Sequence, residues 1–149
     1  MTPYEIVAII ISVAGLIISL VSIIKSNRAH KISQGQIELN IHQLINQTQK
    51  DVIDISIALA ERCTNDNQQA KELMEKALST AYERNLNAYE EACAKYLDHK
   101  VDKERFKKNY HKEIRQLVES KHWKGKFDST TSPYKAILKV YKEWNDLEQ

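Results

Sequence analysis

Residues that interrupt helices are scarce in this chain, which has three glycines and two prolines among 149 residues. In an average protein, glycine makes up about 7 % of the residues and proline about 5 %. No segment has the alternating pattern of a strand, and the chain contains no internal repeat and no low-complexity segment. The composition therefore predicts an all-α fold.

Signatures of catalysis are also missing. The chain has no glycine-rich phosphate loop, no HExxH and no GxSxG. Its five histidines lack the spacing of metal ligands: His30, His42, His99, His111 and His122. Glu90 and Glu91 are adjacent, and neighbouring residues on a helix point about 100° apart, so we interpret this carboxylate pair as a solvated helix face. We expect no enzymatic activity, no metal and no cofactor.

Cysteine is rare as well. Cys63 and Cys93 form no CxxC pair and no Cys/His ligand spacing. In a reducing compartment, which the charge pattern described next indicates, such cysteines stay reduced. We predict that both are small buried hydrophobic residues.

A run of 19 uncharged residues, 6–24, consists almost entirely of Ile, Val, Leu and small residues. At 1.5 Å per residue it forms a helix of about 28 Å, which matches the hydrocarbon thickness of a bilayer. Lys25, Arg28 and Lys31 follow the run, whereas Glu5 precedes it. The positive-inside rule therefore predicts a single-pass inner (cytoplasmic) membrane protein with its N-terminus outside. A cleaved signal peptide is the competing interpretation, but no Lys or Arg precedes the run and no small-x-small site follows it.

Small residues recur along this run at alternating steps of four and three. Within the run they are Ala8, Ser12, Gly15, Ser19 and Ser22, and the pattern continues to Ser26, Ala29 and Ser33. Helices in lipid associate through close backbone approach, which small residues permit. The stripe predicts a homo-oligomer of parallel helices, such as a dimer or a tetramer. The alternative is that small residues are merely tolerated in an anchor.

The chain divides into four predicted parts: a short non-cytoplasmic N-terminus at 1–5, the transmembrane helix at 6–24, a juxtamembrane stalk helix at 25–62 and a soluble all-helical domain at 63–149. Gly35 marks the expected junction of anchor and soluble part, with an offset in helical register. The apolar residues from Ile37 to Leu59 keep to one side of a helix. This stretch either continues the anchor as a stalk or folds back on its own domain.

Three further helices are predicted. One runs from about Ala70 to Leu97, a turn occupies 98–102, and a second helix carries Phe106, Tyr110, Ile114, Leu117 and Val118 on one face. The last follows Ser132 and Pro133, which have the pattern of an N-cap and a first helical residue.

Positive charge is concentrated between residues 95 and 126. This segment contains eleven Lys or Arg and five Asp or Glu, which gives it a net charge of +6. Cations interleaved with aromatic rings suit an anionic ligand with stackable bases. The predicted ligand-binding residues are Arg115, Lys121, His122, Trp123, Lys124 and Lys126. Three alternatives stay open: a solvated lysine-rich helix face, a Trp123 that fills the core, and contact of the cations with anionic lipid.

A single N-terminal span, a small helical cytosolic domain with a basic and aromatic cluster, and self-association together resemble the membrane-anchored ancillary effectors of type III CRISPR defence. This architecture is also similar to single-span helical proteins found near phage-defence genes. The resemblance implies binding of a cyclic oligoadenylate, with cyclic tetra-adenylate as the first choice, and an action on the membrane.

The predicted function is thus an antiviral effector that senses an anionic nucleotide and perturbs the membrane through its oligomeric anchors. Its expected partners are the lipid bilayer, further copies of itself and a cyclic oligonucleotide, but no duplex nucleic acid. The alternative is a membrane-tethered protein-interaction module, whose long helix from Ala70 to Leu97 docks a partner. A holin-like pore former is the third possibility.

Overall fold

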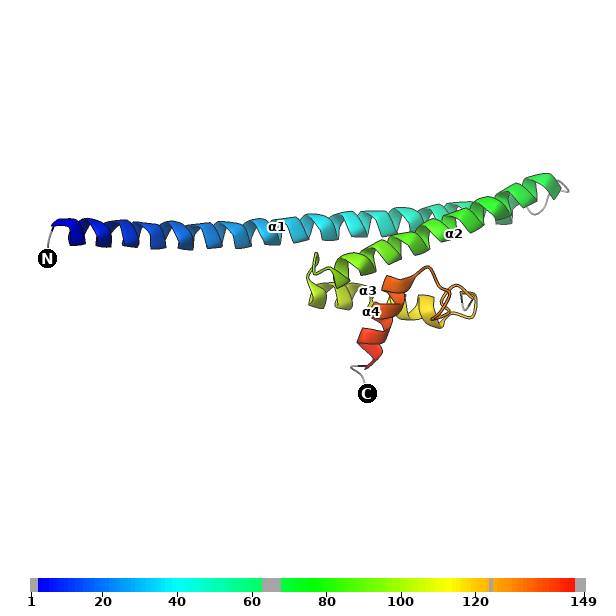
Figure 1. The fold of residues 1–149 in the computed structure, drawn as a ribbon. Coiled ribbons are helices and arrows are strands. Elements are labelled where there is room, and N and C mark those ends of the chain that lie inside the picture. Colours follow the sequence, from blue (N-terminus) through cyan, green and yellow to red (C-terminus); the bar gives the residue numbers. More distant parts are fainter. Residues whose placement is uncertain (1–2, 63–67, 124, 147–149) are drawn as a thin grey trace. The chain divides into compact units, whose positions relative to one another are not determined.

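The computed structural model describes residues 3–62, 68–123 and 125–146, with the backbone alone for 5–11 and 62. In these ranges the chain forms four α-helices and no strand, which confirms the predicted all-α class. The helices are α1 (Pro3–Arg62), α2 (Gln68–Leu97), α3 (Lys103–Glu119) and α4 (Lys135–Asp146) (Figure 1). The chain divides into two compact units, Met1–Gln36 and Ile37–Gln149.

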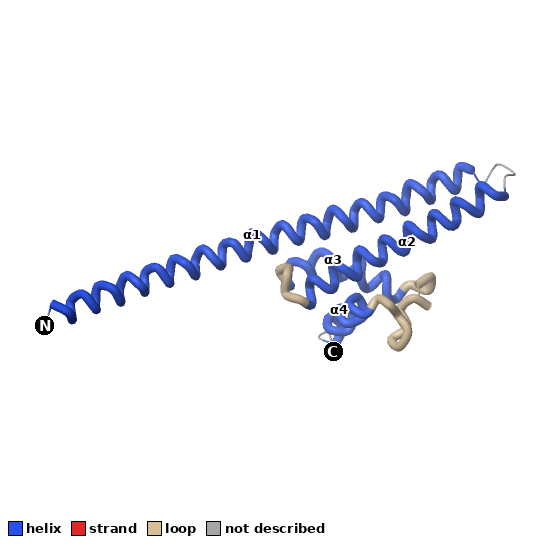
Figure 2. The backbone as a smooth tube through the Cα atoms, turned by 45° about the horizontal axis from the view of Figure 1, so that its top comes forward, coloured by secondary structure: helices blue, strands red, loops and turns tan. Residues whose placement is uncertain are grey.

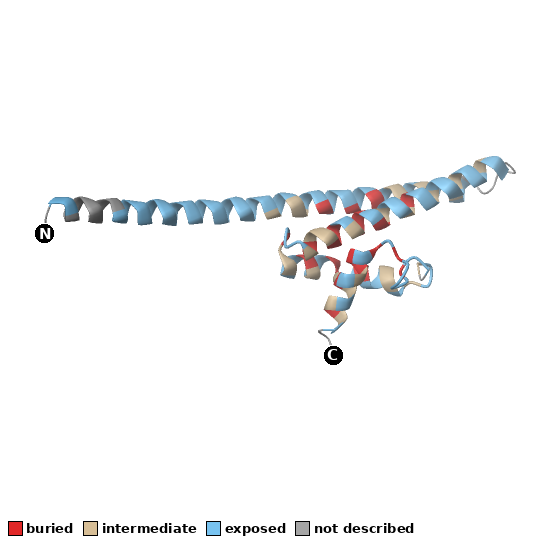
Figure 3. Ribbon diagram, in the orientation of Figure 1, coloured by how far each residue is buried: buried red, intermediate tan, exposed pale blue. Residues whose placement is uncertain are grey.

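The first unit contains the apolar part of α1. Of the described helices, this one is long and apolar enough to cross a membrane, although a signal sequence meets the same criteria of length and composition. Its large apolar side chains are 46–66 % exposed (Figure 3): Val13, Leu16, Ile17, Ile18, Leu20, Val21, Ile23 and Ile24. Burial in a protein core therefore does not account for this run.

Helix α1 passes through Gly35 without a break, and the offset in the register of the apolar pattern at that residue stays a prediction. Gly35 does not have a positive φ, and a Cβ added to it would meet nothing within 4 Å. A single glycine inside a helix costs about 0.5–1 kcal/mol relative to alanine, which weakens a helix without ending it.

In the second unit, α1 from Ile37 onward lies along α2 (Figures 1 and 2). Its buried face carries Ile41, Ile45 and Thr48. The Asn85 amide donates a hydrogen bond to Thr48 Oγ1 at 3.0 Å. The two interpretations of this stretch hold together, since it belongs to the same helix as the apolar run and also packs on its own domain.

The core brings together side chains of α2, α3 and α4. The most completely buried large side chains are Leu86, Cys93, Ile114, Ile137, Val140 and Trp144. Burial raises the pKa of the Cys93 thiol and keeps it protonated, which confirms the prediction of a buried hydrophobic residue. Cys63 lies outside the described residues.

Hydrogen bonds pair the polar atoms of Trp144 and Tyr96 inside this core. Trp144 Nε1 donates to the Tyr96 hydroxyl at 3.0 Å, and that hydroxyl donates to Glu143 Oε1 at 2.8 Å. The Lys103 ammonium lies 3.8 Å from the same Glu143 oxygen and 4.7 Å from the centre of the Tyr96 ring. Burying an indole N–H costs free energy unless it finds an acceptor. This series of hydrogen bonds provides that acceptor and connects the buried indole to the charged pair of Glu143 and Lys103 at the surface.

The turn between α2 and α3 falls where it was predicted. His99 adopts a left-handed backbone conformation, with φ of 56°, just after the last residue of α2, a position where such a residue commonly ends a helix. Asp102 caps α3, because its carboxylate accepts the Arg105 N–H at 2.9 Å.

The last helix begins two residues later than predicted, at Lys135 instead of Pro133. Ser132 Oγ accepts the Tyr134 N–H at 3.0 Å, and the Tyr134 carbonyl accepts the first helical hydrogen bond, from Leu138, at 3.3 Å. The serine therefore closes a turn ahead of the helix and does not cap the helix itself.

Glu90 of α2 supplies the acceptors that α4 needs. Glu90 Oε1 accepts the Ala136 N–H at 2.7 Å, and Glu90 Oε2 accepts the Ile137 N–H at 2.9 Å. The interpretation of Glu90 as part of a solvated face is wrong, whereas Glu91 is exposed. A carboxylate at a helix N-terminus also interacts favourably with the helix dipole.

Replacing Glu90 should therefore destabilise the domain far more than replacing its neighbour. We expect Glu90→Ala to lower the free energy of unfolding by about 2 kcal/mol, because two charge-assisted hydrogen bonds and a cap are lost. Glu91→Ala should cost less than about 0.5 kcal/mol, since its pairing with Lys95 at 3.9 Å is exposed. Urea unfolding of the full chain in detergent micelles, followed by tryptophan fluorescence, measures both; equal losses would contradict the assignment.

Candidate functional site

The segment after α3 brings three of the predicted ligand-binding residues, His122, Trp123 and Lys126, to α2. Ser120 ends α3, and its N–H donates to the Gln116 carbonyl at 3.1 Å. The Trp123 N–H donates to the Ser120 carbonyl at 3.1 Å, and the Lys126 N–H donates to the Trp123 carbonyl at 2.8 Å. These turns reverse the chain and bring His122 and Trp123 against α2.

Three aromatic rings meet there. The ring centres of His122 and Trp123 are 4.4 Å apart, and those of Tyr82 and Trp123 are 5.1 Å apart. Both pairs are edge-to-face, with interplanar angles of 83° and 70°, the geometry that aromatic quadrupoles favour. Trp123 is half-buried and also packs against the core, so it fills space and lines the site at once.

These rings form one wall of a pocket of about 260 Å³. We call it the aromatic pocket. Its lining residues come from α2 and from the segment after α3: Glu75, Leu78, Ser79, Tyr82, Glu83, His122, Trp123 and Lys126. The volume is slightly below the range of drug-sized sites, about 300–1,000 Å³, so the pocket suits a single ring system.

The charges of the aromatic pocket are mixed. Lys126 Nζ lies 3.0 Å from Glu83 Oε1, and this hydrogen bond raises the pKa of the lysine. Glu75 adds a second carboxylate to the lining. The pocket therefore offers acceptors next to the rings and one ammonium, not the purely cationic surface that the sequence suggested.

The predicted ligand-binding residues separate into two groups. The structure gathers His122, Trp123 and Lys126 in the aromatic pocket. Arg115 is on α3, where its Nε pairs with Glu119 at 3.0 Å, and it does not line the pocket. Lys121 is exposed beside the pocket residues in sequence but is not among its lining residues. Lys124 lies outside the described residues.

Sequence reasoning missed the contribution of α2. Five of its residues line the aromatic pocket, at positions 75, 78, 79, 82 and 83. These positions follow the i, i+3, i+4, i+7, i+8 spacing of one helix face. The spacing marks a shared face, but nothing local says that Trp123 packs on it.

The predicted anchor-packing residues lie on α1. Ser19 Oγ donates to the Gly15 carbonyl at 2.9 Å, and Ser22 Oγ donates to the Ile18 carbonyl at 2.8 Å. A Cβ added to Gly15 would meet nothing within 4 Å of this chain, and Ser12 is exposed. Ala8 lies in the stretch whose side chains are not described.

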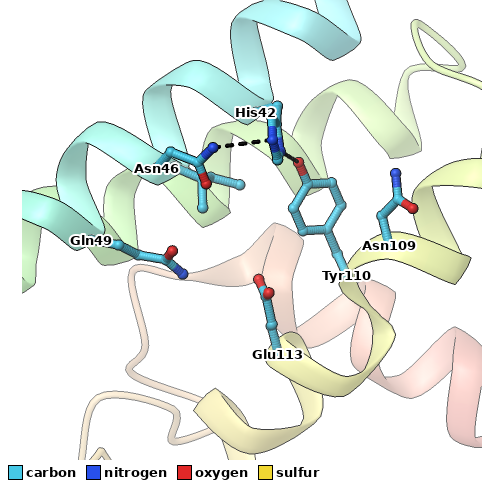
Figure 4. A pocket seen from close by; sticks show the side chains of 7 residues that line it. His42, Asn46, Gln49, Asn109, Tyr110 and Glu113 are labelled. Atoms are coloured by element: carbon cyan, nitrogen blue, oxygen red, sulfur yellow. Dashed lines mark hydrogen bonds between the residues drawn. The ribbon is translucent and has the colours of Figure 1, made fainter.

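A second cavity, of about 270 Å³, lies between α1 and α3 (Figure 4). We call it the polar pocket. Its lining residues, Ile45 apart, are polar or phenolic: His42, Asn46, Gln49, Asn109, Tyr110 and Glu113. Sequence reasoning missed it, because it needs the contact between two helices that are distant in the chain.

Hydrogen bonds fix the side chains of the polar pocket. The Gln49 amide donates to the Tyr89 hydroxyl at 2.8 Å, and that hydroxyl donates to Glu113 Oε2 at 2.5 Å. Asn46 Nδ2 lies 3.0 Å from His42 Nε2, and His42 Nδ1 lies 3.5 Å from the Tyr110 hydroxyl. Burial, and then the hydrogen bond to Glu113, raises the pKa of Tyr89.

No group of three or more His, Cys, Asp or Glu side chains suited to a metal occurs among the described residues. Comparisons with known proteins add nothing to the geometry: no protein-family model matches the chain, and neither a curated protein nor a solved structure is significantly similar to it. Function has to be argued from the pockets and the apolar helix.

Tyr82 should control the exposure of Trp123. We expect Tyr82→Ala to increase acrylamide quenching of tryptophan fluorescence by about twofold, because an aromatic wall on the indole is lost. Trp144 is 1 % exposed and contributes little quenching. Tyr82→Phe keeps the ring and serves as the control. If acrylamide quenches the fluorescence of Tyr82→Phe as strongly as that of Tyr82→Ala, the ring contact is not what shields Trp123.

Proposed function

We propose that this chain is a membrane-anchored sensor whose Ile37–Gln149 unit binds an anionic nucleotide, with the cyclic oligoadenylates as the first candidate ligands. One observation carries the proposal: the aromatic pocket places three rings beside carboxylates and a lysine. A nucleotide has complementary parts, namely a flat base, exocyclic amino groups and phosphates.

The rings account for the base. Stacking of a base on an aromatic side chain contributes about 1–3 kcal/mol, and Tyr82 and Trp123 stand edge-to-face with their faces differently oriented. Glu75 and Glu83 lie where the amino group of an adenine would find an acceptor. The pocket volume of about 260 Å³ suits one base, so a cyclic ligand would engage several copies of the chain.

The cations account for the phosphates. Lys126 is exposed and pairs with Glu83, and a phosphate of the ligand would share or take over this ammonium through a charge-assisted hydrogen bond. Lys121 and Lys124 flank Trp123 in the sequence. Arg115 is held by Glu119 on the same helix, so the proposal does not depend on it.

The apolar segment of α1 accounts for the anchor. We propose that residues 6–24 cross the bilayer, with Lys25, Arg28 and Lys31 on the cytoplasmic side. Copies would pack through the face of Ser12, Gly15, Ser19 and Ser22, where Gly15 leaves open space. Because α1 is one helix from Pro3 to Arg62, a ligand-induced repacking of its C-terminal half has a continuous route to the anchor.

Nucleotide binding is tested on the full chain in zwitterionic nanodiscs, by thermal unfolding and particle mass with a panel of cyclic and linear oligoadenylates. We expect one cyclic species to raise the unfolding temperature, since a ligand of the folded state stabilises it by mass action. Trp123→Ala should weaken binding about tenfold or more, and Lys126→Glu should weaken it and flatten its salt dependence.

Lys139→Glu is the matched control, because Lys139 is an exposed lysine of α4 outside the aromatic pocket. It should bind like the unmodified chain. A panel without any stabilising member at low salt would refute the nucleotide proposal.

A second candidate function has its own observation. Leu73 of α2 is 70 % exposed, and Ile53 and Ile57 of α1 are more than half exposed, which suits an apolar contact with a protein partner. The chain would then be a membrane-tethered interaction module. Its binding should change little with salt, whereas nucleotide binding should weaken steeply.

Membrane insertion is tested by matched pairs of arginines. Each arginine near the centre of a span costs about 2.5–3.5 kcal/mol of insertion, so Ile17→Arg with Val21→Arg should release the chain from membranes on alkaline carbonate extraction. Ile53→Arg with Ile57→Arg has the same spacing on the same helix, and Ile53 is as exposed as Ile17, at 57 %. This second pair should stay in the membrane pellet.

Equal behaviour of the two pairs would contradict a membrane-spanning segment at 6–24. An intact mass that lacks residues 1–24 would instead identify the segment as a cleaved signal.

A further inference from the structure

The polar pocket contains a half-buried carboxylate without a cationic partner. Among the described residues, no ion pair includes Glu113. In the part of the chain that the structure describes, the neutral Tyr89 hydroxyl donates to Glu113 Oε2 at 2.5 Å. A carboxylate removed from water needs compensation by charge or by several hydrogen bonds, and one hydroxyl supplies only part of it.

Two other carboxylates of the second unit, those of Glu38 and Glu119, are paired with cations. Glu38 Oε2 lies 2.9 Å from Arg105 Nη1, and Glu38 Oε1 accepts the Asp102 N–H at 2.9 Å. Glu119 pairs with Arg115 at 3.0 Å. Glu113 differs from these two residues because its carboxylate lines a cavity, whereas theirs are paired with arginines.

Two amide groups lie beside Glu113 in the polar pocket. The amide nitrogen of Gln49 uses one N–H on the Tyr89 hydroxyl, and that of Asn46 lies within hydrogen-bond distance of His42 Nε2. Their carbonyl oxygens remain as acceptors for a group that enters the pocket. Figure 4 shows Gln49 and Glu113 reaching into the space between α1 and α3 from opposite sides.

The remaining walls suit the carbon atoms of such a group. Ile45 and the Tyr110 ring provide apolar surface, and a tyrosine ring attracts cations through its quadrupole. Burial, and then the charges of Glu113 and Glu38, raises the pKa of Tyr110, which is consistent with a negative potential in the pocket.

We propose that the polar pocket binds a small organic cation with a primary ammonium group, which pairs with Glu113 and donates to the amide oxygens of Asn46 and Gln49. The cavity of about 270 Å³ has room for a short alkylamine. The site is separate from the aromatic pocket, with which it shares no lining residue.

The test uses 1,4-diaminobutane as the probe and 1,4-butanediol as its neutral counterpart of equal length. Calorimetric titration of the full chain in zwitterionic nanodiscs, at constant ionic strength and with empty nanodiscs as the blank, should show binding of the diamine only. Equal binding of the diol, or no diamine binding up to about 10 mM where carboxylate-ammonium pairs in a pocket are detectable, would overturn the proposal.

Two variants with opposite expected effects on diamine affinity test whether the diamine binds in the polar pocket. Glu113→Gln keeps an acceptor for Tyr89 and removes the charge, so diamine affinity should fall at least tenfold. Asn46→Asp adds a second carboxylate to the lining, so affinity should rise severalfold. Because one variant must gain affinity, a general loss of folding does not reproduce the result.

Glu104→Gln is the control, since Glu104 is an exposed glutamate of the same helix and does not line the pocket; it should leave the affinity unchanged. Equal losses in Glu104→Gln and Glu113→Gln would overturn the assignment. Trp123→Ala should also leave diamine binding intact, so a failure of nucleotide binding and a failure of this site are separate results.

Discussion

The helical domain depends on the contact between the Glu90 carboxylate and the first N–H groups of α4. A helix of 12 residues is too short to be stable alone in water, and its N-terminal N–H groups have no partners within the helix. Glu90 supplies two acceptors, at 2.7 and 2.9 Å. This contact positions the helix that carries Ile137, Val140 and Trp144, three of the most buried side chains. One carboxylate of α2 thereby sets the place of α4 in the core.

The helices themselves could be predicted from the sequence because the signals are local. Phe106, Tyr110 and Ile114 recur at steps of four, and the structure buries all three. The start of α4 could not be predicted from the sequence, because the acceptors for its first N–H groups come from Glu90, 46 residues earlier in the chain.

The candidate site was predictable in part, for the same reason. His122 and Trp123 are adjacent, so their shared place could be anticipated, whereas Tyr82 reaches them only through tertiary packing. Charge was the weaker guide: the sequence shows that Lys126 is basic but not that it lies 3.0 Å from Glu83. A count of cations along a chain overstates the positive surface wherever folding gives each one a carboxylate.

The serines of the apolar helix bond to their own backbone, through the Gly15 and Ile18 carbonyls. A hydroxyl without an acceptor in hydrocarbon is costly, and these bonds remove that cost in a solitary helix. Contact between copies would then rest on van der Waals packing, which weakens quickly with separation. If copies associate in a bilayer as proposed, the association would respond to the bilayer itself, because a change in lipid thickness alters helix tilt and with it the depth at which Gly15 of neighbouring copies would meet.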